Sequence, residues 1–140
     1  MIVLDTNDAS ELTRPVPARV VVARMRAQRA NDLYTTSITM AEIRYGIERL
    51  PDGRRKEQLK SAADGVFSAF AEAVLSFDAA ATLAYAEIVS KRERTGRQIN
   101  GFDAQIAAIC RTHHAQLATR NVKDFTDTEL EVINPSGVDR

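Results

Sequence analysis

Residues 1–7 read Met-Ile-Val-Leu-Asp-Thr-Asn, and the apolar run from Ile2 to Leu4 stops abruptly at Asp5. Three apolar residues are too few for a helix, but they suit a buried strand. A carboxylate that directly ends a buried strand is uncommon, so we favour a functional role for Asp5 over a simple turn cap. This stretch therefore predicts a sheet protein whose first strand ends in an acid.

Further short apolar runs follow, and segments with helical spacing separate them. Strands are expected at residues 33–35, 74–77, 116–119 and 131–133. Helices are expected from Asp8 until Pro15 and Pro17, then at 18–28, 37–50, 54–70, 78–96 with Asp78 as cap, and from about 102 to 110. Short strands alternating with helices predict an α/β sandwich with a mainly parallel central sheet. No linker or repeat interrupts the pattern, which predicts one domain over residues 1–140.

The composition is that of an ordinary globular protein, with 44% hydrophobic and 27% charged residues. Acidic and basic residues balance at 19 each, so the chain lacks the basic excess of a passive nucleic-acid binder. Cys110 is the only cysteine, which fits a reducing cytoplasm. No apolar stretch approaches the roughly 20 residues that span a bilayer, and the N-terminus does not resemble a signal peptide. We therefore expect a cytoplasmic protein without a membrane segment.

Acidic and amide residues gather around the expected strand ends. Asp5 follows the first strand, Glu42 lies near the start of the helix after the second, and Asp103 opens the helix before the fourth. Asn121 and Asp124 follow the fourth strand. The carboxyl ends of parallel strands border the ligand crevice, so these side chains can meet there. Carboxylates in one cleft repel each other unless a cation compensates, and Mg²⁺ or Mn²⁺ suits such oxygen ligands.

Most of these acids also have a structural interpretation that the sequence leaves open. Glu42 completes a capping box with Thr39, and Ser37 or Thr39 is the expected cap of this helix. Asp103 can simply complement the dipole of its helix. For Asp8 we favour a helix cap over a metal ligand.

Other reactive residues are interpreted as structural. Cys110, His113 and His114 have a helical spacing that a soft metal can use. However, Cys110 is expected to pack in the core, and the two histidines are expected to be exposed at a helix end. No Gly-x-Ser-x-Gly, P-loop or Gly-x-Gly-x-x-Gly motif is present, so ATP- or NAD-dependent chemistry is unsupported.

Basic and aromatic residues are candidates for contacts with a polyanionic ligand such as a nucleic acid. Arg44 and Arg120 neighbour the proposed acids and are the preferred contacts to phosphate. Tyr45 and Phe102 can stack a base, but core or rim packing is favoured. The remaining basic runs are expected to be mostly solvated helix faces: Arg24/Arg26/Arg29, Arg54-Arg55-Lys56 and Lys91-Arg92/Arg94/Arg97.

Four ordered motifs carry a family resemblance: MIVLDTN at 1–7, SITMAEIRYG at 37–46, DAQIAA at 103–108 and ATRN at 118–121. Together they resemble the PIN-domain nucleases, and more narrowly the VapC- and FitB-type toxins of bacterial toxin–antitoxin pairs. The resemblance spans nearly the whole chain, and four motifs in order are far more specific than any one of them.

This resemblance implies a three-layer α/β/α sandwich and an endoribonuclease that depends on Mg²⁺ or Mn²⁺. Such an enzyme hydrolyses RNA phosphodiesters with a metal-activated water. Asp5, Glu42 and Asp103 would be the catalytic metal ligands, and Thr6 a supporting hydroxyl. The resemblance also implies a homodimer that acts as the toxin of a type II pair and is blocked by a cognate antitoxin.

The chain departs from the family pattern at two positions. Asn121 stands where many relatives have a fourth aspartate; as a neutral amide it is expected to act through hydrogen bonds, and Asp124 is the alternative for the acidic role. Asp8 stands where relatives usually have an aliphatic residue. One tightly held metal ion is therefore expected rather than two.

Two other functions remain as alternatives. A receiver-like signalling domain also has an acidic Mg²⁺ pocket on a small α/β sheet, but it needs a partner lysine, for which Lys123 is the only nearby candidate. The other alternative is a non-catalytic PIN-like binding module that has lost metal affinity through Asn121.

Overall fold

The computed structural model describes residues 1–11, 13 and 32–134. The elements in chain order are β1 Ile2–Leu4, α1 Thr6–Glu11, β2 Leu33–Thr36, α3 Ser37–Glu48, α4 Arg54–Ala69, β3 Val74–Leu75, α5 Ala79–Arg94, α6 Gly101–Thr112, β4 Gln116–Ala118, the 3₁₀ turn η2 Val122–Phe125 and β5 Val132–Ile133. Strands and helices therefore alternate as expected. The helix expected at 18–28, with Arg24/Arg26/Arg29, and the prolines at 15 and 17 lie outside the described residues.

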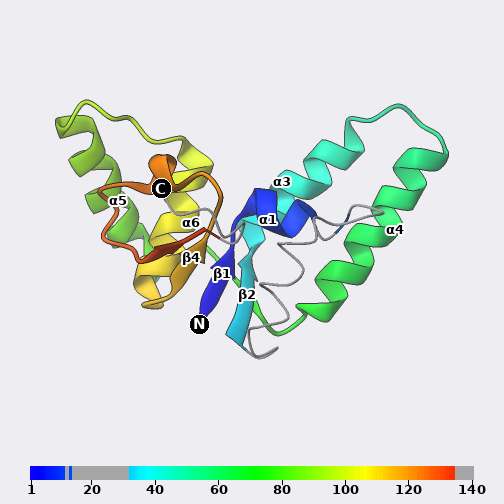
Figure 1. The fold of residues 1–140 in the computed structure, drawn as a ribbon, viewed down its shortest axis with the longest axis horizontal. Coiled ribbons are helices and arrows are strands. Elements are labelled where there is room, and N and C mark those ends of the chain that lie inside the picture. Colours follow the sequence, from blue (N-terminus) through cyan, green and yellow to red (C-terminus); the bar gives the residue numbers. More distant parts are fainter. Residues whose placement is uncertain (12, 14–31, 135–140) are drawn as a thin grey trace.

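The strands form a sheet in the order β3-β2-β1-β4-β5, and each neighbouring pair is parallel (Figure 1). The register places Ile2 beside Leu33 on one side and Gln116 on the other. The expected parallel sheet is thus confirmed. Strand β3 is shorter than the expected 74–77, because its pairing with β2 ends after two residues.

Side chains of the strands alternate between two cores, one on each face of the sheet. Val3 packs with Ile88 of α5 and Ile109 of α6. Ile2 and Leu4 belong to the other core, which contains residues of α1, α3 and α4. Figure 1 shows the same division, with α5 and α6 on one side of β1 and β2, and α3 and α4 on the other. These layers confirm the α/β/α sandwich.

Two helix starts differ from the expectation. Thr36 caps α3, because its hydroxyl accepts the Thr39 amide N–H at 3.0 Å; neither Ser37 nor Thr39 is the cap. The carboxylate of Asp5 accepts the Asp8 amide N–H at 2.9 Å, so Asp5 caps the start of α1 and the capping role expected for Asp8 is wrong. In both cases the strand leads directly into the helix, which moves the cap back to the end of the strand.

Several structural interpretations are confirmed. The carboxylate of Asp78 accepts the Ala81 amide N–H and caps α5. Cys110 is fully buried in a core, whereas His113 and His114 are exposed. Among the described residues, no helix is both long and apolar enough to cross a membrane.

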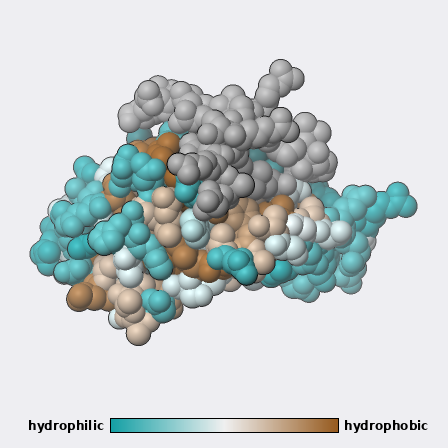
Figure 2. All heavy atoms as spheres, turned by 90° about the horizontal axis from the view of Figure 1, so that it is seen from below, coloured by the Kyte–Doolittle hydropathy of each residue, from teal (hydrophilic) through white to brown (hydrophobic). Residues whose placement is uncertain are grey.

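Hydrophilic surface dominates the two ends of the long axis, with apolar patches between them, in the view of Figure 2. Arg54 and Arg55 are exposed as expected. Lys56 is buried instead, and its ammonium donates to the Glu48 carbonyl at 2.9 Å. Arg92 is buried as well. The interpretation as solvated helix faces is therefore wrong for these two basic residues.

The order of the chain reverses in the middle of the sheet. β2 and β3 lie on one side of β1, whereas β4 and β5 lie on the other. Such a switch point opens a crevice at the carboxyl ends of the strands. Because α6 runs back to the start of β4, its first turn lies at the same edge (Figure 1). The topology therefore brings Asp103 to this edge although its helix precedes a strand.

Candidate active site

A cavity of about 240 Å³ lies at the carboxyl edge of the sheet. It brings together the three predicted acids, the predicted Asn121 and the predicted Thr6, whereas Asp124 is not part of its lining. Its lining residues are Asp5, Thr6, Asn7, Glu42, Asn100, Asp103, Asn121 and Phe125. Segments that are far apart in the sequence therefore meet at one site.

Two larger hollows, of about 500 and 430 Å³, share Arg111 and Glu129 in their linings. The charges there neutralise one another: the Arg111 guanidinium lies 3.0 Å from a Glu87 oxygen and 3.4 Å from a Glu129 oxygen. The Lys91 ammonium lies 3.8 Å from another oxygen of Glu129. Among the residues that the structure describes, no basic side chain forms an ion pair with the three predicted acids of the smaller cavity, so the smaller cavity is the better candidate for chemistry.

Asp5 is held rigidly on both carboxylate oxygens. One oxygen accepts the Asp8 amide N–H, and the other accepts a short hydrogen bond from the Thr119 hydroxyl. The same Thr119 oxygen accepts the Asn121 amide N–H at 3.0 Å. Burial raises the pKa of the Asp5 carboxyl, against the lowering effect of these hydrogen bonds. The site thus fixes the orientation of Asp5 while burying its charge.

Glu42 lies half-buried on the second turn of α3. The Thr6 hydroxyl donates to a Glu42 carboxylate oxygen at 2.5 Å, which joins the start of α1 to α3. The Thr39 amide N–H is bound by Thr36 instead, so the capping box of Glu42 with Thr39 is wrong. The Glu42 carboxylate is therefore directed towards α1 and the cavity.

Asp103 stands in the first turn of α6, behind a cap formed by Asn100, whose side-chain oxygen accepts the Phe102 amide N–H at 2.8 Å. Burial raises the pKa of the Asp103 carboxyl to about 6, and the negative charges of Asp124, Glu42 and Asp5 add to this shift. The charge of Arg92 acts in the opposite direction. The acids are thus close enough to repel one another, which is the situation that a cation relieves.

The donor set of this cavity fits a hard divalent cation. Asp5, Glu42 and Asp103 offer only carboxylate oxygens, which Mg²⁺ and Mn²⁺ prefer. Within the described ranges, however, no three His, Cys, Asp or Glu side chains already have the spacing of a metal site. An ion held by all three acids would therefore need these side chains closer together than they stand here, and Asp5 is the one with hydrogen bonds to both carboxylate oxygens.

The two preferred arginines both pair with carboxylates, but only one of them does so beside the site. The Arg44 guanidinium pairs with the Asp64 carboxylate at 2.9 Å and lies over the Phe67 ring, on the α4 side of α3. Arg120 lies beside α1, 3.7 Å from Asp8 and 3.9 Å from Glu11. The structure thus places Arg120, but not Arg44, next to acids of the site region.

Asp8 is completely buried and lies beside the proposed ligands rather than among the residues that line the cavity. Burial, followed by the charge of Asp5, raises the pKa of the Asp8 carboxyl to about 8. Among the described residues, neither of its carboxylate oxygens has a hydrogen-bond partner. One carboxylate oxygen of Asp8 lies 3.7 Å from the guanidinium of the partly exposed Arg120.

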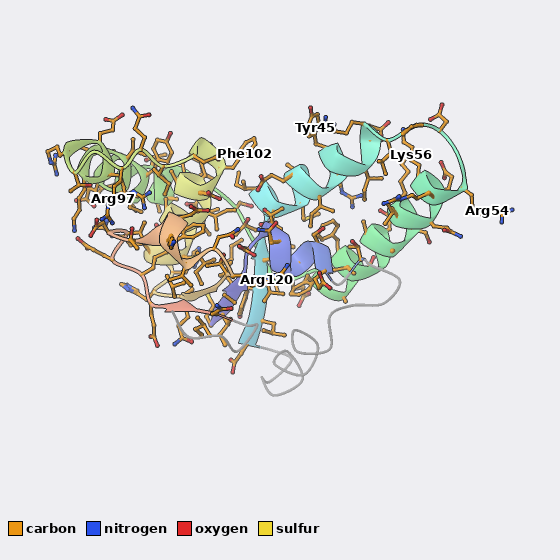
Figure 3. The ribbon with its side chains drawn as sticks, turned by 45° about the horizontal axis from the view of Figure 1, so that its top comes forward. Tyr45, Arg54, Lys56, Arg97, Phe102 and Arg120 are labelled. Atoms are coloured by element: carbon orange, nitrogen blue, oxygen red, sulfur yellow. The ribbon has the colours of Figure 1, made fainter. Side chains whose placement is uncertain are left out.

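Tyr45 and Phe102 are exposed, with 66% and 51% of their surface accessible, so neither packs in a core, and the rim position stays a prediction. Figure 3 shows them projecting from α3 and from the start of α6, whereas Arg120 lies near α1. Lys123, the lysine that a receiver-like site would need, is exposed on η2 and is not part of the cavity lining. The geometry therefore gives no support to the receiver-like alternative.

Sequence reasoning missed two residues that shape the site, Thr119 and Asn100. Asn100 has a recognisable signal, since Asn is a preferred helix cap and the apolar spacing of α6 begins just after it. Thr119 has no such signal, because its role depends on β4 lying beside β1.

Comparisons of the sequence and of the fold with known proteins show the family of this chain. The model of the PIN domain family matches residues 2–129. The VapC ribonuclease Y4jK of Sinorhizobium fredii is 39% identical over 136 residues, which cover 96% of this chain and 97% of the relative. The toxin FitB of Neisseria gonorrhoeae is 36% identical over 96% of this chain and 98% of the relative.

A solved structure agrees with these sequence matches. The crystal structure of FitAcB from Neisseria gonorrhoeae superposes with a TM-score of 0.90 at 35% identity, over 99% of this chain and all of the matched chain. The chain therefore belongs to the PIN-domain family. Within that family it is similar to the VapC and FitB proteins, as the four motifs predicted.

Proposed function

We propose that this protein is a metal-dependent endoribonuclease and the toxin of a type II toxin–antitoxin pair. The observation that carries the proposal is the convergence of Asp5, Glu42 and Asp103 on one cavity at the switch point of the sheet. Relatives named as a VapC ribonuclease and as the toxin FitB, each aligned over 96% of this chain, support it.

In this proposal Asp5, Glu42 and Asp103 hold Mg²⁺, which Mn²⁺ can replace, and Asn121 completes the catalytic set. When bound, the ion supplies a Lewis acid that activates a water and offsets charge on the phosphoryl group. Asp5 and Glu42 are oriented beforehand by the hydroxyls of Thr119 and Thr6. This orientation lowers the cost of arranging the ligands.

Asn121 suits a position next to the RNA phosphate better than an additional acid would. Its backbone is anchored by Thr119, and its side chain lines the cavity. The carboxamide of an asparagine can donate a hydrogen bond to a phosphoryl oxygen, whereas the carboxylate of an aspartate would repel that oxygen. Asp124 is exposed and close enough to raise the pKa of Asp103, so it adds negative potential at the rim.

The proposed partners follow from the relatives. RNA is the substrate class of a ribonuclease, and FitB is present in the solved structure of FitAB bound to an IR36 DNA fragment. We therefore assign this chain a cognate antitoxin and a place in the cytoplasm, where RNA and antitoxin are both present. The homodimeric state is proposed on the family resemblance alone.

Removal of single acids tests the proposed activity. Asp103→Asn and Glu42→Gln keep the shape of each side chain but remove its charge. We expect each to lower kcat/KM for RNA cleavage in Mg²⁺ by more than the roughly 10- to 100-fold typical of a residue that only supports a ligand. Asp64→Asn is the matched control, since Asp64 is exposed on α4 and pairs only with Arg44 among its described contacts. It should cleave as the wild type does.

Mg²⁺-dependent cleavage that survives in both acid variants would refute the proposal. Calorimetry with Mn²⁺ separates the enzyme from a non-catalytic module. Binding heat without cleavage of any RNA identifies a metal-binding module, and no heat at millimolar Mn²⁺ identifies an inert one. Each of these results contradicts the proposed enzyme.

A further inference from the structure

Arg92 is a buried cation in the last turns of α5. Only 5% of its surface is accessible, although it belongs to a basic run that resembles a solvated helix face. A buried guanidinium is costly unless its N–H groups are bound. The acceptors that bind the N–H groups of Arg92 therefore indicate its structural role.

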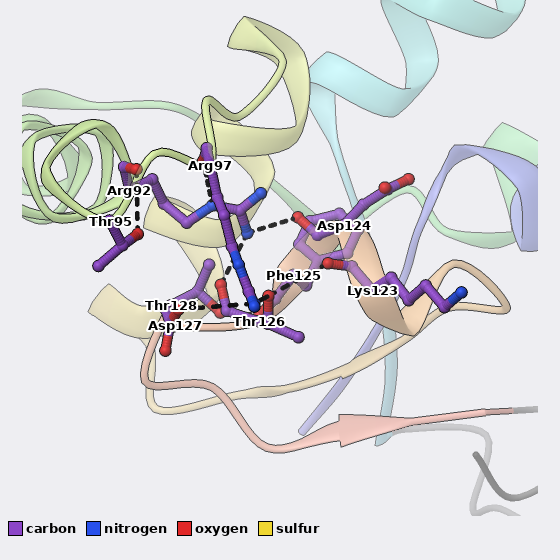
Figure 4. Close-up of polar contacts among 9 residues, drawn as sticks. All are labelled: Arg92, Thr95, Arg97, Lys123, Asp124, Phe125, Thr126, Asp127 and Thr128. Atoms are coloured by element: carbon purple, nitrogen blue, oxygen red, sulfur yellow. Dashed lines mark hydrogen bonds and ion pairs between the residues drawn. The ribbon is translucent and has the colours of Figure 1, made fainter.

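The guanidinium connects two loops. Its Nε donates to the Arg97 carbonyl at 2.6 Å, in the loop between α5 and α6. One terminal nitrogen donates to the Asp124 carbonyl at 3.0 Å and to the Thr126 carbonyl at 2.7 Å, in the turn after β4. Figure 4 shows Arg92 between the two loops. These hydrogen bonds span 32 and 34 residues of sequence.

The attachment to the first loop is reciprocal. The Arg97 amide N–H donates to the Arg92 carbonyl at 2.8 Å, while the Arg92 side chain binds the Arg97 carbonyl. Gly96, with a φ of 74°, makes this helix end possible. Arg92 is therefore fixed to this loop by both its backbone and its side chain.

Both loops lead directly to the acid cavity. The first continues into Asn100, which caps α6 and so places Asp103. The second contains Asp124 itself and follows Asn121. At the surface the loops touch more weakly, with the Arg97 guanidinium 3.4 Å from the Thr126 hydroxyl. The buried connection is Arg92.

The second loop needs such a connection because its backbone is strained. Asp127 and Glu129 have φ values of 60° and 61°, in the left-handed region that non-glycine residues rarely adopt. Strained conformations persist only where surrounding contacts over-determine them. The carbonyls that Arg92 binds lie immediately before this stretch, and the Thr128 hydroxyl adds a hydrogen bond to the Phe125 carbonyl at 2.5 Å.

We propose that Arg92 is a positioning residue of the acid site: from the interior it joins the loop that leads to Asp103 to the turn that carries Asn121 and Asp124. Arg92 touches neither metal nor substrate in this role. It sets the distance between two walls of the cavity, so its loss loosens the metal site. The role of this site as a metal centre rests on the proposed function above.

The test uses the full chain with Arg92→Ala, Arg92→Lys and Arg94→Ala. Arg94 is the matched control, because it lies on the same helix, carries the same charge and donates to Ser90 at an exposed position. Hydrogen exchange of the amides in 97–103 and 121–126 is measured without metal, relative to the amides of β1 and β4. Mn²⁺ affinity is measured by calorimetry at a temperature where every variant is folded.

We expect Arg92→Ala to speed exchange in both loops more than in β1 and β4, and to weaken Mn²⁺ binding about 10- to 100-fold. Arg92→Lys should change both measurements in the same direction but by less. Lysine keeps the positive charge, whereas a single ammonium group cannot reach both loops as the planar guanidinium does. Arg94→Ala should stay within about twofold of the wild type, as a surface substitution does.

Uniformly faster exchange with unchanged Mn²⁺ affinity would show that Arg92 only stabilises the fold, and would overturn the proposal. If Arg92→Ala does not fold, Arg92→Lys decides by the same criteria. If the wild type binds no Mn²⁺, the proposed function fails, while local exchange in the two loops still decides whether Arg92 joins them.

Discussion

At the scale of single residues, buried hydroxyls do much of the orienting in this site. Thr119 donates to Asp5 and accepts from the Asn121 backbone, so one side chain sets two members of the proposed catalytic set. Thr35 is equally buried, but its hydroxyl oxygen has no hydrogen-bond partner among the described residues. Thr119 and Thr35 therefore compare a buried hydroxyl that makes hydrogen bonds in the site with a buried hydroxyl that has no partner among the described residues.

Replacement by valine keeps the shape of threonine and removes the hydroxyl. We expect Thr119→Val to lower the free energy of unfolding by about 1–3 kcal/mol, because Asp5 and Asn121 each lose a buried partner. It should also weaken Mn²⁺ binding. Thr35→Val is the control and should be neutral or stabilising. Denaturant unfolding with Mn²⁺ calorimetry measures both effects, and equal losses in the two variants would contradict this account.

Asp8 is the residue with the clearest pH signature. Its pKa of about 8 in the folded protein lies above the ordinary value of 3.8 for an aspartate, so between these values the folded state holds a proton that the unfolded chain has released. Stability therefore falls as pH rises through this window, by at most about 1.4 kcal/mol per pH unit. The stabilisation that comes from the raised pKa of Asp8 is fully present below about pH 4 and is lost above about pH 8.

Asp8→Asn removes this titration. In metal-free buffer, we expect the free energy of unfolding of Asp8→Asn, relative to the wild type, to increase by more than about 1 kcal/mol between pH 5 and pH 8. Urea unfolding at the two pH values provides the measurement. Asp64→Asn, at an exposed carboxylate, should show no such increase. A constant difference between Asp8→Asn and the wild type would show that Asp8 is ionised in the folded protein across this range.

At the scale of elements, helix ends decide where the site residues stand. α1, α3 and α6 each begin at the carboxyl edge of the sheet, and each start is capped by a side chain: Asp5, Thr36 and Asn100. The end of α5 matters as much, because Gly96 turns the chain back towards α6. Gly96 adopts a positive φ, whereas Gly65 lies inside α4 with open space around it.

Alanine at these two glycines should have opposite effects. Gly96→Ala forces a left-handed residue with a Cβ, so we expect a loss of about 1–2 kcal/mol in the free energy of unfolding. Gly65→Ala should add about 0.5–1 kcal/mol, because alanine restricts the unfolded chain and favours the helix. Thermal and denaturant unfolding test both. A stabilised Gly96→Ala would contradict the left-handed helix end.

The elements themselves could be predicted from short-range patterns. Apolar runs gave all five strands, and the spacing of Ile43 and Ile47 gave α3, because both faces of this sheet are covered and each helix buries one stripe. The caps were harder to predict. Thr36 ends a strand and begins a helix, and no sequence pattern separates these two roles.

At the scale of the whole molecule, the strand order explains which site residues the sequence reveals. Asp5 and Asn121 were placed at the cavity because residues that follow parallel strands share one edge, whereas Asp124 follows the same strand but does not line the cavity. Asp103 needed the path of α6, which the order β3-β2-β1-β4-β5 supplies. Arg92 was misread, because a charge run on a helix looks the same whether solvent or a returning loop covers it.

The hydrogen bond between Thr119 and Asp5 also determines how late during synthesis the acid site can be completed. It joins positions 114 residues apart in the chain, and ribosomes add about 5–20 residues per second. For roughly 6 to 23 s after Asp5 is synthesised, a growing chain therefore lacks Thr119, whose hydroxyl orients Asp5. During that interval a nascent molecule holds the first acid of the proposed site beside ribosomal RNA, but Asp5 does not yet have the hydrogen bond that orients it.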